Sequence, residues 1–219
     1  MRLYLSLSPN EEIIPYNYQP LLTGAIHKWM GKDNFEHGKL SLYSFSWLQN
    51  VNTSKKGISL SKDSHFFISA FNDELIKTIL KNITIDPSVC SGSEVTTIQI
   101  KESPQFRIKE TFQCASPIFI KRRIDNEIKH IDYTDKLSGT YLTETMIKKL
   151  ASVGVNSSGL TIEFDNTYSK PQSKLIHYKN ILNKASICPV IIEGTPDQIA
   201  FAWNVGIGNS TGIGFGALK

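Results

Sequence analysis

Alternating apolar and polar residues predict β-strands at intervals along the whole chain. Near the N-terminus, Leu3, Leu5 and Leu7 alternate with other residues before Pro9, and residues 40–47 show the same period. A period of two places alternate side chains on one face of a strand, which is typical of a strand with one buried face. Further strands are expected within residues 65–71, 95–112, 115–123, 160–164, 187–192 and 215–219.

Other segments carry apolar residues at helical spacing, and some of them have recognisable ends. These segments are 21–30, 75–83, 142–153 and 199–205. Gly31 is expected to end the first helix, and Asp73 is expected to cap the second. Before the last helix, Thr195 and Gln198 have the spacing of a capping box, with Pro196 at the first helical position.

The order of these elements predicts the fold. A strand, a helix, two strands, a helix and a strand follow one another in the first half, and the second half repeats this order less cleanly. The motif β-α-β-β-α-β is that of a ferredoxin-like unit. We therefore expect an α+β protein of two tandem ferredoxin-like units, with an N-terminal domain over residues 1–113 and a C-terminal domain over 114–219. A single irregular α+β domain is the alternative.

The segment 206–216 is rich in glycine and is the most informative part of the chain. Its glycines are Gly206, Gly208, Gly212, Gly214 and Gly216. The segment follows a predicted helix, whereas dinucleotide-binding loops run from a strand through glycines into a helix, so the order argues against a nucleotide cofactor. Glycines permit close backbone approach and positive φ, and their amides can bind phosphate oxygens. A mobile tail without function is the alternative interpretation.

Composition and charge narrow the classes of function without choosing among them. The 219 residues are 40% hydrophobic and 20% charged, as in an ordinary globular protein. A net charge of +4 permits nucleic-acid binding but does not require it. Cys90, Cys114 and Cys188 lack CxxC spacing, so reduced buried thiols are expected rather than a disulfide framework or a zinc site. No apolar run approaches the roughly 18 residues of a membrane span, and a cytoplasmic protein is expected.

Four features together resemble one known family over the whole chain. They are the leucine-rich first strand, a tyrosine-containing approach to a helix that includes Gly24, the sequence Ser116-Pro117-Ile118-Phe119 followed by basic residues, and the glycine-rich segment near the end. This combination resembles the CRISPR-associated endoribonucleases of the RAMP superfamily, which cut precursor CRISPR RNA within its repeats. The resemblance implies tandem ferredoxin-like folds, a cleft that carries RNA, and cleavage without a metal ion.

The resemblance also implies a reaction in which the RNA attacks itself. The 2′-hydroxyl beside the scissile phosphate attacks in line and leaves a 2′,3′-cyclic phosphate and a 5′-hydroxyl. Such chemistry needs a base, an acid and positive charge on the developing phosphorane. In the family, a histidine closely followed by glycine is catalytic, which points to His37 before Gly38, with Lys39 directing charge at the same phosphate. His27, on the predicted first helix but off its apolar stripe, is a further catalytic candidate in the N-terminal domain.

Basic residues and the glycine-rich segment are the expected RNA contacts. By the resemblance, Lys121, Arg122 and Arg123 touch the RNA backbone, although a solvated strand end is the plainer interpretation of such a run. The RNA-binding set also includes the glycines at 206, 208, 212, 214 and 216. The expected partner is CRISPR repeat RNA, with no membrane and no cofactor or metal. Association with other CRISPR effector subunits and formation of a homodimer stay open.

A binding protein of the same superfamily is the second hypothesis. A non-catalytic RAMP subunit that only binds CRISPR RNA in an effector complex would share the fold and the glycine-rich segment. The discriminating feature is the pair His27 and His37 in the N-terminal half, because a pure scaffold has no need of them. The endoribonuclease is therefore the leading hypothesis.

Overall fold

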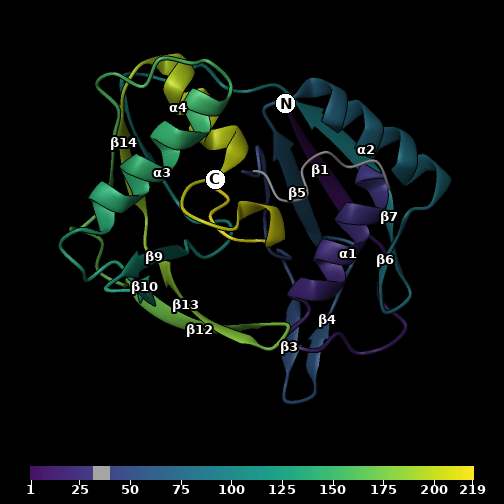
Figure 1. Ribbon diagram of the computed structural model, residues 1–219. Helices are drawn as coiled ribbons and strands as arrows, with labels where there is room; N and C mark the ends of the chain where they lie inside the picture. The colour runs from purple at the N-terminus through teal and green to yellow at the C-terminus, as the bar shows by residue number, and fades with distance from the viewer. Residues whose placement is uncertain (32–39) are drawn as a thin grey trace.

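The computed structural model describes residues 1–31 and 40–219. Its helices lie in two neighbouring units, with the C-terminal end of the chain between them (Figure 1). The first unit holds α1 (Gln19–Met30) and α2 (Asp73–Ile85), and the second holds α3 (Ser138–Ser152) and α4 (Pro196–Val205). None of the described helices combines the length and the apolar character that a bilayer crossing requires.

The first unit is built on a 5-stranded antiparallel sheet. In spatial order its strands are β2 (Tyr43–Phe45), β5 (His65–Ala70), β1 (Arg2–Leu7), β7 (Ser93–Lys101) and β6 (Ser88–Cys90). The chain runs β1-α1-β2-β5-α2-β7, and β1 lies between β5 and β7, which is the ferredoxin-like arrangement. A short hairpin of β3 (Asn52–Ser54) and β4 (Gly57–Ser59) is inserted between β2 and β5.

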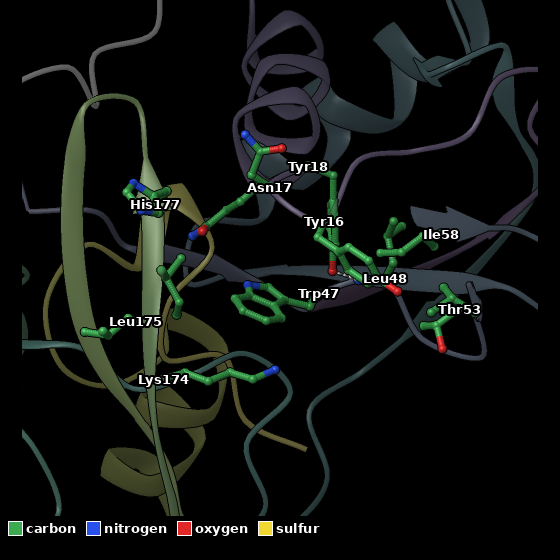
Figure 2. A pocket seen from close by; sticks show the side chains of 13 residues that line it. Tyr16, Asn17, Tyr18, Trp47, Leu48, Thr53, Ile58, Lys174, Leu175 and His177 are labelled. Carbon is green, nitrogen blue, oxygen red and sulfur yellow. Dashed lines mark hydrogen bonds between the residues drawn. The ribbon is translucent and has the colours of Figure 1, made fainter. Parts of the chain in front are cut away.

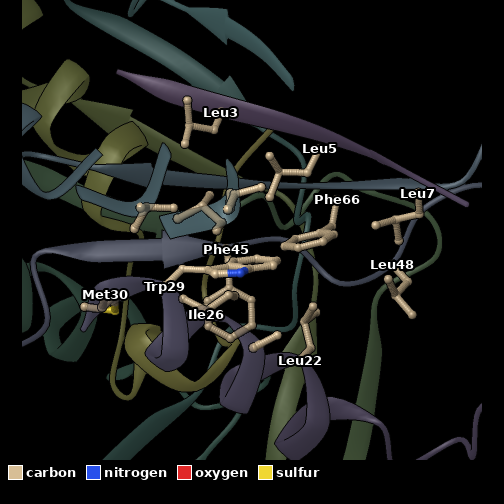
Figure 3. Close-up of a cluster of buried hydrophobic side chains, with 14 of the residues drawn as sticks. Leu3, Leu5, Leu7, Leu22, Ile26, Trp29, Met30, Phe45, Leu48 and Phe66 are labelled. Carbon is tan, nitrogen blue, oxygen red and sulfur yellow. The ribbon is translucent and has the colours of Figure 1, made fainter. Parts of the chain in front are cut away.

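The alternating leucines of β1 explain how this unit is held together. Leu3, Leu5 and Leu7 are each at most 1% exposed and belong to a cluster that includes Ile26 and Trp29 of α1. Figure 3 shows these leucines on one side of the cluster and the α1 side chains on the other. Burial of one such side chain stabilises the fold by about 1.5–3 kcal/mol. The period-two pattern of the N-terminus is therefore the sheet side of this core.

The second unit repeats the arrangement with a shorter sheet. Its strands in spatial order are β11 (Thr161–Phe164), β14 (Val190–Glu193) and β8 (Lys109–Phe112). Just after β8, Cys114 forms an antiparallel bridge with Leu218, so the C-terminal end occupies the place of the fourth ferredoxin-like strand. Thr195 and Gln198 form the predicted capping box at the start of α4. The expected α+β class with tandem ferredoxin-like units is thus confirmed.

Three details of the predicted elements differ in the structure. The final strand expected at 215–219 is only an isolated bridge, because Gly214 and Gly216 have φ of 87° and 66° and interrupt the extended backbone. Asn72, not Asp73, caps α2: its Oδ1 accepts a hydrogen bond from the amide of Glu74 at 2.9 Å. The β-rich stretch at 95–112 is divided, since β7 lies in the first sheet and β8 in the second. The domain division at residue 113 stays a prediction.

Two further hairpins lie outside the two sheets. Three of their four strands were not predicted from the sequence, and the fourth, at Ile120–Ile124, falls within the segment 115–123 where a strand was expected. β9 (Ile120–Ile124) pairs with β10 (Glu127–Ile131), and β12 (Gln172–Tyr178) pairs with β13 (Ile181–Ile187). Leu175, Ile181 and Leu182 of the second hairpin are exposed. Because these apolar side chains do not face a core, the hairpin lacks the clean alternation by which a half-buried strand is recognised.

The glycine-rich segment 206–216 packs between the two units. Gly206 and Gly216 are in close contact, and the amide of Ile207 donates to the carbonyl of Gly216 at 2.9 Å. A Cβ at Gly206 would lie 2.8 Å from the Cβ of Ser44 on β2, and a Cβ at Gly208 would lie 2.5 Å from the carbonyl oxygen of Phe119. The segment therefore touches both units through positions where only glycine fits.

Arg2 makes a second connection between the units. Its guanidinium carbon lies 3.8 Å from the ring centre of Phe67 in the first unit and 3.4 Å from that of Trp203 on α4. One guanidinium nitrogen donates to the carbonyl of Trp203 at 3.0 Å. Arg2 is only 1% exposed, and this burial lowers its pKa to about 10. A cation held between two aromatic rings fixes β1 against α4.

Replacing one glycine of the segment tests whether its close packing stabilises the fold. Gly216 has φ of 66°, and an added Cβ would overlap with the carbonyl oxygen of Ile207. Gly159 has a similar φ of 79° but open space around the added atom. We expect Gly159→Ala to cost about 1–2 kcal/mol from backbone strain alone, and Gly216→Ala to cost about 1–3 kcal/mol more. Urea unfolding measures both, and equal losses would contradict close packing at Gly216.

Candidate functional site

His27 is linked to the glycine-rich segment through one tyrosine. It lies on α1 and is partly buried, and its Nε2 is 3.1 Å from the hydroxyl oxygen of Tyr43 on β2. That hydroxyl donates to the carbonyl of Gly212 at 3.0 Å. A hydroxyl that donates to Gly212 can still accept a hydrogen bond from Nε2, so the three groups form one continuous link.

A cavity of about 290 Å³ lies beside this link. Its walls come from residues 208–213 of the glycine-rich segment, from Leu40 and Ser41 before β2, and from Thr145 and Lys149 on α3. Gly212 belongs both to the cavity wall and to the hydrogen-bonded link with Tyr43. The cavity therefore adjoins the chain segment that His27 contacts through Tyr43.

Lys149 is the buried cation of this cavity. Its ammonium donates to the carbonyls of Val205 and Gly206, each at 3.2 Å, and to the hydroxyl of Thr211 at 3.0 Å. The first two acceptors are at the C-terminal end of α4, where the helix dipole favours positive charge. Burial nevertheless lowers the pKa of Lys149 to about 7, and within residues 1–31 and 40–219 no carboxylate forms an ion pair with it. The site thus contains an ammonium whose charge is sensitive to pH near neutrality.

The three consecutive cations of β9 do not act as one group. Arg122 is turned toward α3, where its guanidinium donates to the carbonyl of Tyr141 and, at 2.8 Å, to the hydroxyl of Thr145. Lys121 and Arg123 alternate with it and are exposed on the other face. The backbone amide of Lys121 donates to the side chain of Asn209 at 2.8 Å, which fixes β9 to the glycine-rich segment. Two of the predicted cations are therefore accessible, and one tethers the hairpin.

The structure describes some of the predicted site residues and not others. His37 and Lys39 lie outside the described residues, so their place in the site stays a prediction. His27 is brought to Gly212 by Tyr43, and the glycines of the segment line the joint between the units. The RNA-binding roles of Lys121, Arg122, Arg123 and the glycines stay predictions.

Tyr43 and Lys149 were not predicted as site residues from the sequence, although the position of Lys149 in its helix could have indicated it. Lys149 lies on α3 between Met146 and Leu150, both buried, so it interrupts the apolar stripe that predicts this helix. A lysine on such a stripe must be neutral, paired or hydrogen-bonded. Tyr43 occupies an alternating strand position like any core residue, and only the folded chain shows that its hydroxyl joins His27 to Gly212.

Metal ligands are not clustered in the part of the chain that the structure describes. Within residues 1–31 and 40–219, no three His, Cys, Asp or Glu side chains come together in a group that could hold a metal ion. The only charged side chain on the wall of the 290 Å³ cavity, among these residues, is Lys149. The three N–H groups of this ammonium are already donated to Val205, Gly206 and Thr211.

The chain matches the family model for CRISPR associated protein Cas6, C-terminal, over residues 100–219. A curated relative is CRISPR-associated endoribonuclease Cas6 1 of Methanocaldococcus jannaschii, with 28% identity over 100% of this chain and 92% of the relative.

Solved structures of similar proteins have the same fold. One is the structure titled "Characterization of a Cas6-related gene from Pyrococcus furiosus", with a TM-score of 0.86 and 23% identity over 100% of this chain and 97% of the other. Another, titled "An RAMP protein binding different RNA substrates", has a TM-score of 0.85 and 23% identity over 100% and 98% of the two chains. These likenesses extend over the full length of both units.

Replacing Lys149 tests whether a buried titratable group lies under the glycine-rich segment. An unfolded lysine titrates near pH 10.4, and burial lowers the pKa of Lys149 to about 7. Between these values the unfolded chain binds more protons than the folded chain, so the free energy of unfolding rises with pH. Relative to Lys149→Met, the free energy of unfolding of the wild type should rise by up to about 1.4 kcal/mol per pH unit across this window. Below pH 7 the difference in this free energy between the two proteins should be constant.

The neighbouring lysine provides a matched control for this measurement. Lys148 lies on the same helix but is exposed. Urea unfolding of Lys148→Met between pH 6 and 10 should follow the wild type at a constant offset. If Lys149→Met and Lys148→Met showed the same dependence on pH, Lys149 would not be the buried ammonium described above.

Proposed function

The chain belongs to the Cas6 family of CRISPR-associated proteins, and we propose that it is an endoribonuclease that cuts precursor CRISPR RNA within its repeats. The observation that carries this proposal is the match of residues 100–219 to the family, together with the full-length similarity to a relative named as a CRISPR-associated endoribonuclease. The two-unit fold, with a cavity beside the glycine-rich segment, supports it.

For the reaction we propose internal attack by the 2′-hydroxyl, without a metal ion. His37 and His27 serve as the general base and acid, and Lys39 stabilises charge on the phosphorane. Histidine suits both roles because its pKa is close to neutral. The link from His27 through Tyr43 to Gly212 supports this choice, since it holds the imidazole against the segment that lines the cavity. A single imidazole in a fixed orientation can transfer a proton efficiently.

For RNA binding we propose that exposed cations and the glycine-rich segment act together. Lys121 and Arg123 are accessible on one face of β9, and the amide of Lys121 is bonded to Asn209 of the segment. Phosphates bound by these side chains would therefore run beside the cavity. Arg122 contributes by holding the hairpin against α3, and the glycines contribute by letting the segment pack closely against its neighbours.

Cleavage of repeat RNA in the presence of EDTA tests the proposed reaction. The expected result is a cut at one position in the repeat, with a 2′,3′-cyclic phosphate and a 5′-hydroxyl at the new ends. A substrate with a 2′-deoxynucleotide before the scissile phosphate should bind and resist cleavage. Tight binding of the unmodified repeat without any cleavage would instead support a non-catalytic RAMP subunit. Cleavage of the deoxy substrate would refute internal attack.

Replacing the histidines tests their proposed roles. His37→Ala should slow single-turnover cleavage by roughly 10²- to 10⁴-fold, the range of a general acid or base, with little change in RNA affinity. His27→Ala should also reduce the rate. His65 lies on β5 with its ring against the carbonyl of Asp63, and His65→Ala is the control that should cut at the wild-type rate. A wild-type rate in His37→Ala would remove His37 from the mechanism.

A further inference from the structure

A second and larger cavity, of about 480 Å³, lies between the β12–β13 hairpin and the first unit. Figure 2 shows the Trp47 ring in the middle of it, with β12 on one side and Tyr16 and Tyr18 on the other. Its volume is within the range of pockets that bind small organic groups. We propose that this cavity holds one unpaired base of the RNA, stacked on the indole of Trp47. The proposal rests on the proposed function, because it assumes an RNA substrate.

The Trp47 ring is held in place as a preformed stacking surface. Its Nε1 donates to the carbonyl of Gly214 at 2.9 Å, and the ring of Tyr18 meets it edge-on with centroids 6.3 Å apart. Lys174 from β12 places its ammonium 5.5 Å from the ring centre. An aromatic face accompanied by a flexible cation is the arrangement by which proteins stack bases and bind the adjoining phosphate.

Gln19 offers an unused acceptor in the same cavity. Its side chain lines the cavity and is 4% exposed. The amide nitrogen donates to the carbonyl of Ile213 at 2.6 Å, which fixes the orientation of the side chain. Its Oε1 is buried and has no hydrogen-bond partner among the described residues. A buried acceptor without a partner is costly, and a rotation of the side chain toward the cavity would let an N–H group of a bound base satisfy it.

Charge around the cavity favours a polyanion. The two hairpins beside it, residues 52–59 and 172–187, contain no Asp or Glu. They carry lysines at positions 55, 56, 174, 179 and 184, and only Lys184 has a carboxylate partner among the described residues, Asp132 at 2.6 Å. Among residues 1–31 and 40–219, those that line the cavity include no Asp or Glu either. An RNA strand fits both the aromatic surface of Trp47 and the positive charge around the cavity, whereas an apolar or cationic ligand fits only one of them.

The cavity is coupled to the candidate catalytic region by the glycine-rich segment. Ile213 lines the 290 Å³ cavity and accepts the hydrogen bond of Gln19, and the next residue, Gly214, accepts that of Trp47. A base seated on Trp47 would therefore be fixed relative to the segment that Tyr43 and His27 contact. This would set the register of the RNA, so that one phosphate in the repeat is presented for cleavage.

Tryptophan fluorescence and repeat RNA with single abasic positions test the proposal on the full chain. Trp29 and Trp203 are 0% and 6% exposed, so quenching by RNA should come from Trp47 and should disappear in Trp47→Leu. We expect Trp47→Leu to weaken RNA binding by roughly 5- to 150-fold, which corresponds to one stacked base, and Trp47→Phe to lose less. One abasic position should weaken binding to the wild type and have little further effect on Trp47→Leu.

Controls separate this proposal from the proposed function. Phe71 is an exposed aromatic residue away from the cavity, and Phe71→Leu should bind RNA like the wild type. Lys174→Met should reduce the salt dependence of binding by about one phosphate contact. The abasic positions tested on the wild type decide the question of the base even if Trp47→Leu does not fold. If the wild type binds and cuts repeat RNA but shows no quenching and no sensitive abasic position, the base-binding cavity is refuted while the function stands. If the wild type binds no RNA, both are refuted.

Discussion

Three successive carbonyls of the glycine-rich segment each accept a hydrogen bond from a different side chain of the first unit, and the rest of the structure depends on this contact. Tyr43 donates to Gly212, Gln19 to Ile213 and Trp47 to Gly214, at 3.0, 2.6 and 2.9 Å. A backbone can present consecutive carbonyls to a neighbouring unit only where it approaches closely, and glycine permits that approach. The segment is thus a joint between two ferredoxin-like units as well as a loop.

Side chains with candidate functional roles lie on both sides of this joint. Tyr43 ties the segment to His27, and Lys149 lies beneath it with hydrogen bonds to Val205, Gly206 and Thr211. Gln19 and Trp47 tie it to the larger cavity beside the β12–β13 hairpin. A change in the position of the segment would therefore alter both cavities together. In the proposed function, a common rigid support of this kind would position the proposed binding and cleavage sites relative to one another.

The features that could be predicted from the sequence are local ones. The leucines of β1, the stripe on α1, the capping box of α4 and the position of the glycines after a helix each depend on neighbouring residues in the chain. Features that depend on distant residues could not be predicted. Examples are the contact of Tyr43 with Gly212, the burial of Lys149 and the β12–β13 hairpin, whose exposed apolar residues give no clear period. The prediction of a final strand at 215–219 was wrong for a local reason, because Gly214 and Gly216 take positive φ.

Hydrogen exchange of the native protein tests most directly whether the glycine-rich segment is a buried joint. The amides of Ile207, Asn209 and Gly216 donate to the carbonyls of Gly216, Phe119 and Pro117. If the segment joins the units, these amides should open only with global unfolding and exchange as slowly as the amides of β1 and β5. Exchange at the rate of an unstructured peptide, with β1 and β5 still protected, would show a mobile tail and contradict the account.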